Sequence, residues 1–253
     1  MDHKRQIKIT VRSTTPVINV YKKNNKNSGI VTQILYGDTF KKIKKIGSWI
    51  KIKNDGDNYK GFIKPVNLTK NQKNTHKIYK LSAKLYSKPK LNSIIKKKLS
   101  FGSKIRVFKK EGNFFKFDNF WIKKKDLKKI NSINNNIFSN IFKFNKIKYK
   151  WGGKHFSGVD CSGLVQLCLN YNNRFCPRDT GDQIKYFKKK IKLKNIKKND
   201  LIFWKGHVAI AISKHKLIHA YGPYKKVVVM PIKKTINRIY RTANLKVTGI
   251  RRI

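Results

Sequence analysis

Short runs of apolar and β-branched residues fill the first half of the chain, with turn residues between them. The runs are residues 17–21, 30–36, 40–46, 49–52 and 59–63, and Gly, Asp and Asn stand between several of them. Runs of this length with frequent turns predict short β-strands that close into a small barrel.

The same order of strands and turns recurs further along. Leu99 to Ser103 parallels Leu35 to Asp38, and Gly112 to Phe115 parallels Gly47 to Ile50. Recurrence of one pattern at a fixed spacing is typical of repeated structural units. We therefore expect one all-β barrel at residues 1–70 and a second at residues 75–130.

The pattern changes after an Asn- and Ser-rich stretch at residues 131–140, which we interpret as a linker. Apolar residues then fall at helical spacing, with Asp160 placed to cap the helix start: these residues are Cys161, Leu164, Val165, Cys168 and Leu169. Apolar runs typical of strands follow at 201–204, 207–212, 216–220 and 227–229. A helix followed by an antiparallel sheet predicts an α+β domain at residues 141–253.

The composition is dominated by lysine. The 253 residues carry a formal net charge of +51, and only nine of the 62 basic residues are Arg. Arg is the side chain that reads guanine and clamps phosphate, and the lysines are spread along the whole chain, mixed with Asn and Ile. We therefore interpret the charge as a consequence of AT-rich codons. It predicts weak, salt-sensitive binding to polyanions and no specific nucleic-acid partner.

Three cysteines without paired spacing argue against a disulfide framework. Residues 1–8 contain basic side chains but no following apolar stretch that would indicate a signal peptide. No segment approaches the length of a membrane span. These features together lead us to expect a cytoplasmic protein.

Cys161 is a candidate nucleophile because it stands at the predicted start of a helix. Free backbone N–H groups and the helix dipole stabilise an anion there, which predicts a lowered pKa and a thiolate. A buried structural cysteine explains the position equally well, because free cysteine is commonly buried. Cys168 lies two turns further on the apolar face and is expected in the core.

His207 and His219 are candidate partners of Cys161. A tight turn after residue 212 would bring the strand that begins at His207 beside the strand that ends near His219. His207 could then accept the thiol proton, and His219 could orient the ring of His207. A slip of one residue in the pairing would separate them. A zinc site with three protein ligands is the competing chemistry, although no Cys-x-x-Cys or His-x-x-x-His pair exists.

Several separated motifs occur in a specific order. They are Tyr149-Lys150-Trp151-Gly152-Gly153, Ser157-Gly158-Val159-Asp160-Cys161-Ser162-Gly163-Leu164-Val165-Gln166, Pro177-Arg178-Asp179-Thr180 with Gln183, Asp200-Leu201-Ile202-Phe203-Trp204, Gly206-His207-Val208-Ala209-Ile210 and His219-Ala220. In this order they resemble the NlpC-type papain-like peptidases of bacterial cell walls. The resemblance covers about residues 140–253. The two expected barrels resemble the bacterial SH3-like modules that precede this domain in one branch of that family.

The resemblance implies a papain-like fold and a catalytic triad of Cys161, His207 and His219, with no cofactor. It implies hydrolysis of the γ-D-glutamyl–diamino acid bond in murein peptides, usually short ones with a free N-terminal L-alanine. Family positions that line the substrate site match Tyr149, Asp160 and Ser162, and Asp160 could pair with the substrate ammonium. We expect Arg178, Asp179 and Thr180 to line the same pocket.

One departure from the family pattern concerns the turn before Asp200. Asn199 stands where the family usually has Gly. Asn tolerates a positive φ better than most residues, so we expect the turn to survive.

The expected function is that of a cysteine endopeptidase for murein peptides in cell-wall recycling. Two alternatives remain at this level: a cell-wall or polyanion-binding protein with a degenerate catalytic domain, and an acyltransferase that uses the same triad. The intact Cys161, His207 and His219 favour an enzyme over a binding module.

Overall fold

The computed structural model describes residues 10–253, which form two compact units: the N-terminal unit, which ends at Ile130, and the C-terminal unit, Asn131–Ile253. The expectation about a signal peptide concerns residues that lie outside the described ones. None of the helices within residues 10–253 is long and apolar enough to span a membrane.

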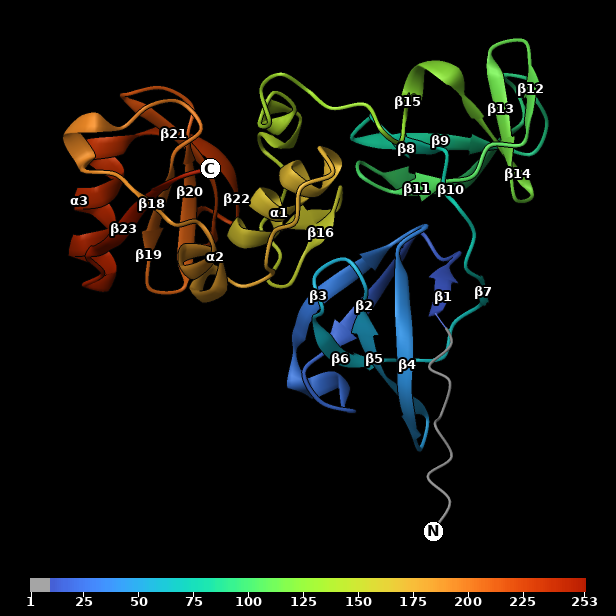
Figure 1. Cartoon of the computed structure of the whole chain (residues 1–253), viewed down its shortest axis with the longest axis horizontal. Coiled ribbons are helices and arrows are strands. Elements are labelled where there is room, and N and C mark those ends of the chain that lie inside the picture. Colours follow the sequence, from blue (N-terminus) through green and yellow to red (C-terminus); the bar gives the residue numbers. More distant parts are fainter. Residues whose placement is uncertain (1–9) are drawn as a thin grey trace. The chain divides into compact units, whose positions relative to one another are not determined.

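The first β region of the N-terminal unit is a seven-stranded antiparallel sheet in the order β3-β2-β6-β5-β4-β1-β7 (Figure 1). The strands are β1 Thr10–Ser13, β2 Val17–Tyr21, β3 Ile30–Leu35, β4 Thr39–Ile46, β5 Trp49–Asn54, β6 Lys60–Ile63 and β7 Leu68–Lys70. Inward-facing residues of alternate positions form its core: Val11, Ile18, Val20, Ile34, Phe40, Ile52 and Ile63.

The second β region consists of a five-stranded sheet, β10-β9-β14-β13-β12, and a three-stranded sheet, β11-β8-β15. Their strands are β8 His76–Ile78, β9 Ser82–Tyr86, β10 Ile94–Ser100, β11 Lys104–Ile105, β12 Lys109–Glu111, β13 Phe114–Phe117, β14 Phe120–Lys123 and β15 Leu127–Lys129. The two regions thus share the antiparallel hairpins that the repeated pattern predicts.

The two β regions are joined by buried polar contacts. Arg12 of the first region, 2% exposed, donates to Asp118 of the second at 2.9 Å, and the Tyr36 hydroxyl also donates to Asp118. The ring of Tyr36 belongs to the hydrophobic core of the second region. Gly37 fits only without a side chain, because a Cβ would lie 1.9 Å from the carbonyl oxygen of Lys104. These contacts explain why residues 10–130 form one compact unit.

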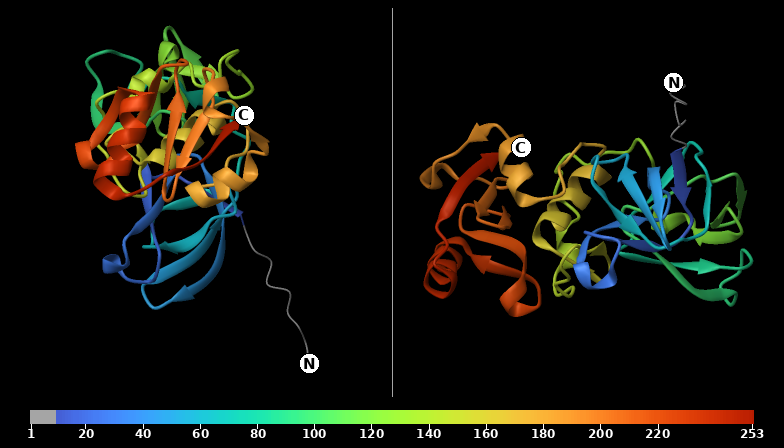
Figure 2. Two further views of the ribbon diagram at one scale, coloured as in Figure 1. Left: turned by 90° about the vertical axis from the view of Figure 1, so that its left-hand side faces the viewer. Right: turned by 90° about the horizontal axis from the view of Figure 1, so that it is seen from below.

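The C-terminal unit is built on a six-stranded antiparallel sheet, β18-β23-β19-β20-β21-β22 (Figure 2). Its strands are β18 Lys189–Lys190, β19 Leu201–Trp204, β20 His207–Ala211, β21 Lys216–Tyr221, β22 Lys226–Pro231 and β23 Val247–Arg252. The helices are α1 Cys161–Tyr171, α2 Thr180–Tyr186 and α3 Ile232–Ala243, and a small hairpin pairs β16 Lys154–His155 with β17 Gly158–Val159.

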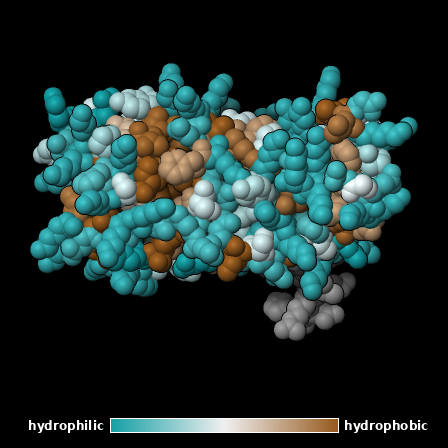
Figure 3. Space-filling view, turned by 90° about the horizontal axis from the view of Figure 1, so that it is seen from above, coloured by the Kyte–Doolittle hydropathy of each residue, from teal (hydrophilic) through white to brown (hydrophobic). Residues whose placement is uncertain are grey.

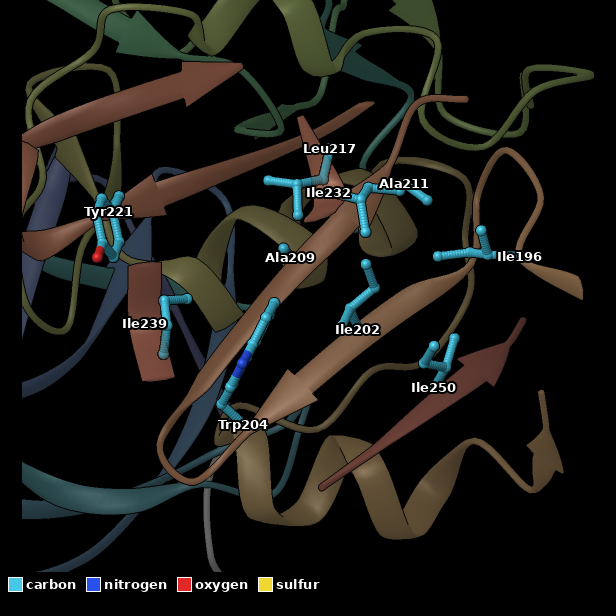
Figure 4. Close-up of a cluster of buried hydrophobic side chains, with 10 residues drawn as sticks. All are labelled: Ile196, Ile202, Trp204, Ala209, Ala211, Leu217, Tyr221, Ile232, Ile239 and Ile250. Carbon is cyan, nitrogen blue, oxygen red and sulfur yellow. The ribbon is translucent and has the colours of Figure 1, made fainter. Parts of the chain in front are cut away.

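One core cluster of this unit combines the sheet with α3 (Figure 4). Its buried members are Ile196, Ile202, Trp204, Ala209, Ala211, Leu217, Tyr221, Ile232, Ile239 and Ile250. Helix α3 was not expected, although Ile232, Ile236 and Ile239 recur at helical spacing. Trp204 and Tyr221 belong to this cluster, and both side chains contact the ring of His207.

Residues 131–140, which the sequence led us to expect as a linker, pack within the C-terminal unit. Phe138 is buried, and the Asn134 backbone N–H donates to the Asn172 side chain just after α1. Hydrophilic side chains cover much of the face drawn in Figure 3, and hydrophobic side chains form patches among them.

Candidate active site

Cys161 is the first residue of α1, and its position is determined by the residue before it. Asp160 has extended backbone angles, and its Oδ1 accepts from the Gly163 N–H at 2.7 Å, as a helix-capping side chain does. Its Oδ2 accepts from the Gly152 N–H, also at 2.7 Å. Cys161 is 6% exposed, and its Sγ lies 4.0 Å from the carbonyl oxygen of Gly206, the neighbour of His207.

The pKa of the Cys161 thiol is raised to about 12. Burial is the largest cause, and the negative charge of Asp160 adds to it, while N–H groups of Val208 and Ser162 act in the opposite direction. The expected lowering of this pKa is therefore wrong, because loss of water outweighs the helix start. The resting sulfur is an uncharged thiol at neutral pH.

The structure brings His207 and His219 together. His207 begins β20, His219 lies on β21, and His207 Nε2 is 2.8 Å from His219 Nδ1. Burial lowers the pKa of His207 to about 4, and burial followed by the nearby His207 lowers that of His219. Both imidazoles are therefore neutral at physiological pH, so the group comprises an uncharged thiol and two uncharged rings.

Aromatic side chains hold the two imidazoles in place. The ring of Tyr221 stacks on that of His219 at 4.7 Å with an interplanar angle of 12°. Trp204 lies 5.6 Å from the ring of His207. His219 Nε2 lies 3.5 Å from the sulfur of Met230, a residue that the sequence analysis missed.

Arg178 lies beside Cys161 as part of a buried ion pair. Its Nη2 is 2.5 Å from Asp160 Oδ2, and its Nη1 donates to Ser162 Oγ at 2.7 Å. The side chains of Arg178 and Asp160 are 1% and 8% exposed. The Asp160 carboxylate thus accepts hydrogen bonds from four protein donors. These are the Gly152 N–H, the Gly163 N–H, the Ser162 hydroxyl at 3.4 Å and the Arg178 guanidinium.

Gln183, on α2, also stabilises the start of α1 through hydrogen bonds. Its side-chain amide donates to the carbonyl oxygens of Ser162 and Pro177 at 3.0 and 2.9 Å. Its complete burial next to the candidate nucleophile is a structural feature that its place in the sequence did not reveal.

The remaining predicted site residues differ in exposure. Tyr149 is partly buried, and burial, together with the negative charge of Asp160, raises the pKa of its hydroxyl. Asp179 is exposed directly before α2, and Thr180 is the first residue of that helix. Burial is the largest single influence on the pKa of the Arg178 guanidinium and lowers it, but the Asp160 carboxylate, followed by that of Asp179, raises it, and the net change is a rise.

Among residues 10–253, no group of three or more His, Cys, Asp or Glu side chains is arranged to hold a metal ion. The zinc alternative therefore receives no support from the arrangement of the described side chains.

The predicted turn at Asn199 is confirmed. Asn199 adopts φ +75°, and its N–H donates to the carbonyl oxygen of Ala211 at 2.7 Å. The Asp200 carboxylate that follows is 1% exposed and pairs with Arg252 at 2.8 Å. This turn fixes the start of β19, which pairs with the strand that carries His207.

Comparisons with known proteins agree with this picture. Residues 146–245 match the model of the NlpC/P60 family, and residues 16–69 match that of the bacterial SH3 domain. A crystal structure of an NlpC/P60 family protein from Bacillus cereus superposes with a TM-score of 0.81 at 19% identity, covering 96% of this chain and 99% of that one. An NlpC/P60 endopeptidase from Photobacterium damselae gives a TM-score of 0.67 at 12% identity, over 95% and 70% of the two chains.

Two curated relatives match over shorter stretches. A dipeptidyl-peptidase 6 from Lysinibacillus sphaericus is 36% identical over 72 residues, which are 28% of this chain and 27% of that protein. A probable endopeptidase from Haemophilus influenzae is 38% identical over 81 residues, 28% of this chain and 49% of that protein. The chain thus covers half or less of the length of these two relatives. The residues around Cys161, His207 and His219 form an NlpC/P60 domain of papain-like fold, and a bacterial SH3 domain precedes it in this chain.

Proposed function

We propose that the protein is a cysteine endopeptidase that hydrolyses the γ-D-glutamyl–diamino acid bond of short murein peptides. The observation that carries this proposal is the arrangement of Cys161, His207 and His219. His207 Nε2 lies 2.8 Å from His219 Nδ1, and Cys161 Sγ lies 4.0 Å from the carbonyl oxygen of Gly206, the residue before His207. Cys161 and His219 are buried and His207 is partly buried, and polar groups in such a place need hydrogen-bond partners.

The first step is transfer of the thiol proton to His207 as the sulfur attacks the amide carbon. Because thiol and imidazole are both neutral at rest, transfer and attack occur together. The developing oxyanion is stabilised by the backbone N–H groups at Cys161 and the start of α1. His207 then gives the proton to the leaving amine of the diamino acid, and a thioester to Cys161 remains.

The second step regenerates the enzyme. Water attacks the thioester while His207 accepts its proton, and the C–S bond breaks to release the γ-D-glutamyl product. The proton returns from His207 to the sulfur. His219 orients the ring of His207 and stabilises the imidazolium that forms briefly in both steps.

For the substrate, we propose that the carboxylate of Asp160, the residue before Cys161, pairs with the N-terminal ammonium of the peptide, because a desolvated ammonium requires a carboxylate partner. Four protein donors hold this carboxylate in place. We propose that Tyr149, Ser162, Arg178, Asp179 and Thr180 line the same pocket. The surrounding lysines attract the carboxylates of D-glutamate and diaminopimelate.

We also propose that the protein acts in cytoplasmic recycling of cell-wall fragments, and that the second β region is another SH3-like module. The repeated order of turns and strands supports the second of these ideas. The two curated relatives are named as peptidases, which supports peptide hydrolysis but not a particular role in cell-wall recycling.

The substrate class is tested by comparing peptides that differ only in the linkage of the scissile bond. Purified protein is incubated with L-Ala-γ-D-Glu-diaminopimelate or with its α-linked isomer, and the products are identified by mass spectrometry. We expect release of L-Ala-D-Glu and diaminopimelate from the γ-linked peptide alone. Equal cleavage of both isomers would exclude the proposed specificity, and no cleavage of either would exclude the peptidase.

A further inference from the structure

The environment of His219 includes an unusual partner. β21 pairs with β22 so that His219 lies opposite Val228. Met230, two residues further along β22, therefore projects to the same face of the sheet as the residue opposite His219. Its sulfur lies 3.5 Å from His219 Nε2.

A thioether sulfur carries no hydrogen and can only accept, although weakly. A contact with Met230 therefore favours the form of His219 that carries its hydrogen on Nε2. A neutral imidazole has a single N–H, so Nδ1 of His219 then becomes an acceptor. Its neighbour at 2.8 Å is His207 Nε2, which must then hold the hydrogen of His207.

The tautomer of His207 determines whether a base is available to the thiol of Cys161. With its hydrogen on Nε2, His207 has a lone pair on Nδ1, the ring nitrogen that does not face His219. That nitrogen can accept the proton of Cys161. In the opposite arrangement, His219 would donate from Nδ1, His207 would carry its hydrogen on Nδ1, and no base would be available to the thiol.

We propose that Met230 is a positioning residue that selects the catalytically competent tautomers of His219 and His207. The inference rests on the proposed peptidase function. Tyr221 assists, because its stacked ring at 4.7 Å keeps His219 turned so that Nε2 points to the sulfur and Nδ1 to His207.

The test measures tautomers directly, by long-range ¹H–¹⁵N correlation NMR of the full chain labelled with ¹⁵N-histidine at pH 7.5. We expect His219 and His207 both to carry the hydrogen on Nε2 in the wild type. A hydrogen on Nδ1 of His219 in the wild type would overturn the proposal, and this measurement requires no variant that could fail to fold.

A pair of variants then tests the role of the sulfur. Met230→Leu keeps a similar volume but removes the acceptor, so we expect mixed tautomers and a kcat about 3- to 10-fold lower with KM unchanged, as for the loss of one weak hydrogen bond. Val229→Leu, on the other face of β22, is the matched control and should change neither quantity. Unchanged tautomers and kcat in Met230→Leu would overturn the proposal.

The two proposals fail in distinguishable ways. If the tautomers are as expected but the γ-linked tripeptide stays intact, the peptidase function fails, and with it the catalytic meaning of Met230. If the peptide is cleaved but Met230→Leu leaves tautomers and kcat unchanged, only the role of Met230 fails.

Discussion

At the scale of single residues, burial controls the chemistry of the site. Cys161 gains N–H groups from its place at a helix start, yet desolvation raises its pKa to about 12. The same burial keeps His207 and His219 neutral. A neutral thiol and a neutral imidazole therefore react together, in contrast to a stable thiolate–imidazolium pair.

The pH dependence of the reaction follows from this charge state. Below its pKa, His207 already holds a proton and cannot accept the one from Cys161, so activity should fall as the pH drops through about 4. We expect kcat/KM to stay level from about pH 6 to 9, where neither His207 nor Cys161 changes charge. Steady-state hydrolysis of the γ-linked tripeptide at a series of pH values measures this. An acid limb at the ordinary histidine value near 6.5 would contradict the neutral pair.

The buried pair of Arg178 and Asp160 should matter for stability. Arg178→Leu leaves the Asp160 carboxylate without its ionic partner, and we expect the free energy of unfolding to fall by about 3–5 kcal/mol. Asp160→Asn combined with Arg178→Leu should recover part of this loss, because no buried charge remains. Urea titration followed by circular dichroism measures both. If Arg178→Leu alone is as stable as the wild type, the ion pair does not contribute to stability.

At the scale of elements, the sequence predicted the strands better than the helices. Alternation and turn residues marked the runs from 17 to 63 and from 201 to 229, where the sheets now lie. Helices α2 and α3 were missed, because α2 is only seven residues long and α3 carries its apolar residues among basic ones. The helix of Cys161 was expected because Asp160 and the apolar spacing agreed.

Contacts between elements that are distant in the sequence could not be predicted from the sequence alone. The pairing of Arg178 with Asp160, and that of Met230 with His219, depends on packing and on the register of β21 and β22. Sequence position alone could neither show that Asp160 has four donors nor weigh the desolvation of Cys161 against the helix start. This is why the sequence could indicate Cys161, His207 and His219 as one candidate group but not the charge on the sulfur.

The turn before β19 offers an element-scale test. Asn199 has φ +75°, a conformation that β-branched residues adopt only with strain. We expect Asn199→Val to lower the free energy of unfolding by about 1–2 kcal/mol. Asn199→Gly is the control and should be close to neutral in urea titrations. Equal stability of both variants would show that the turn can relax.

At the scale of the whole molecule, the partly buried contacts of Asp118 indicate that the two β regions unfold together. The Asp118 carboxylate accepts hydrogen bonds from Arg12 and Tyr36, which belong to the other region. The side chain of Asp118 is 28% exposed, which reduces the expected effect.

Removal of this carboxylate should separate the two regions. Asp118→Ala leaves the Arg12 guanidinium buried without its partner, and we expect a loss of about 1–3 kcal/mol. Hydrogen exchange followed by mass spectrometry on the full chain should show residues 10–70 and 76–129 opening together in the wild type and separately in the variant. Glu111→Ala, which breaks an exposed pair with Lys109, is the control. Coupled opening in Asp118→Ala would contradict this role.

The most direct test of the central claim concerns the thiol of Cys161. L-Ala-γ-D-Glu-diaminopimelate is incubated with the wild type, with Cys161→Ala and with Cys168→Ala, whose buried cysteine lies on the same helix. Mass spectrometry should show cleavage by the wild type and by Cys168→Ala, and an intact tripeptide with Cys161→Ala. Cleavage by Cys161→Ala, or an intact tripeptide with the wild type, would contradict the account.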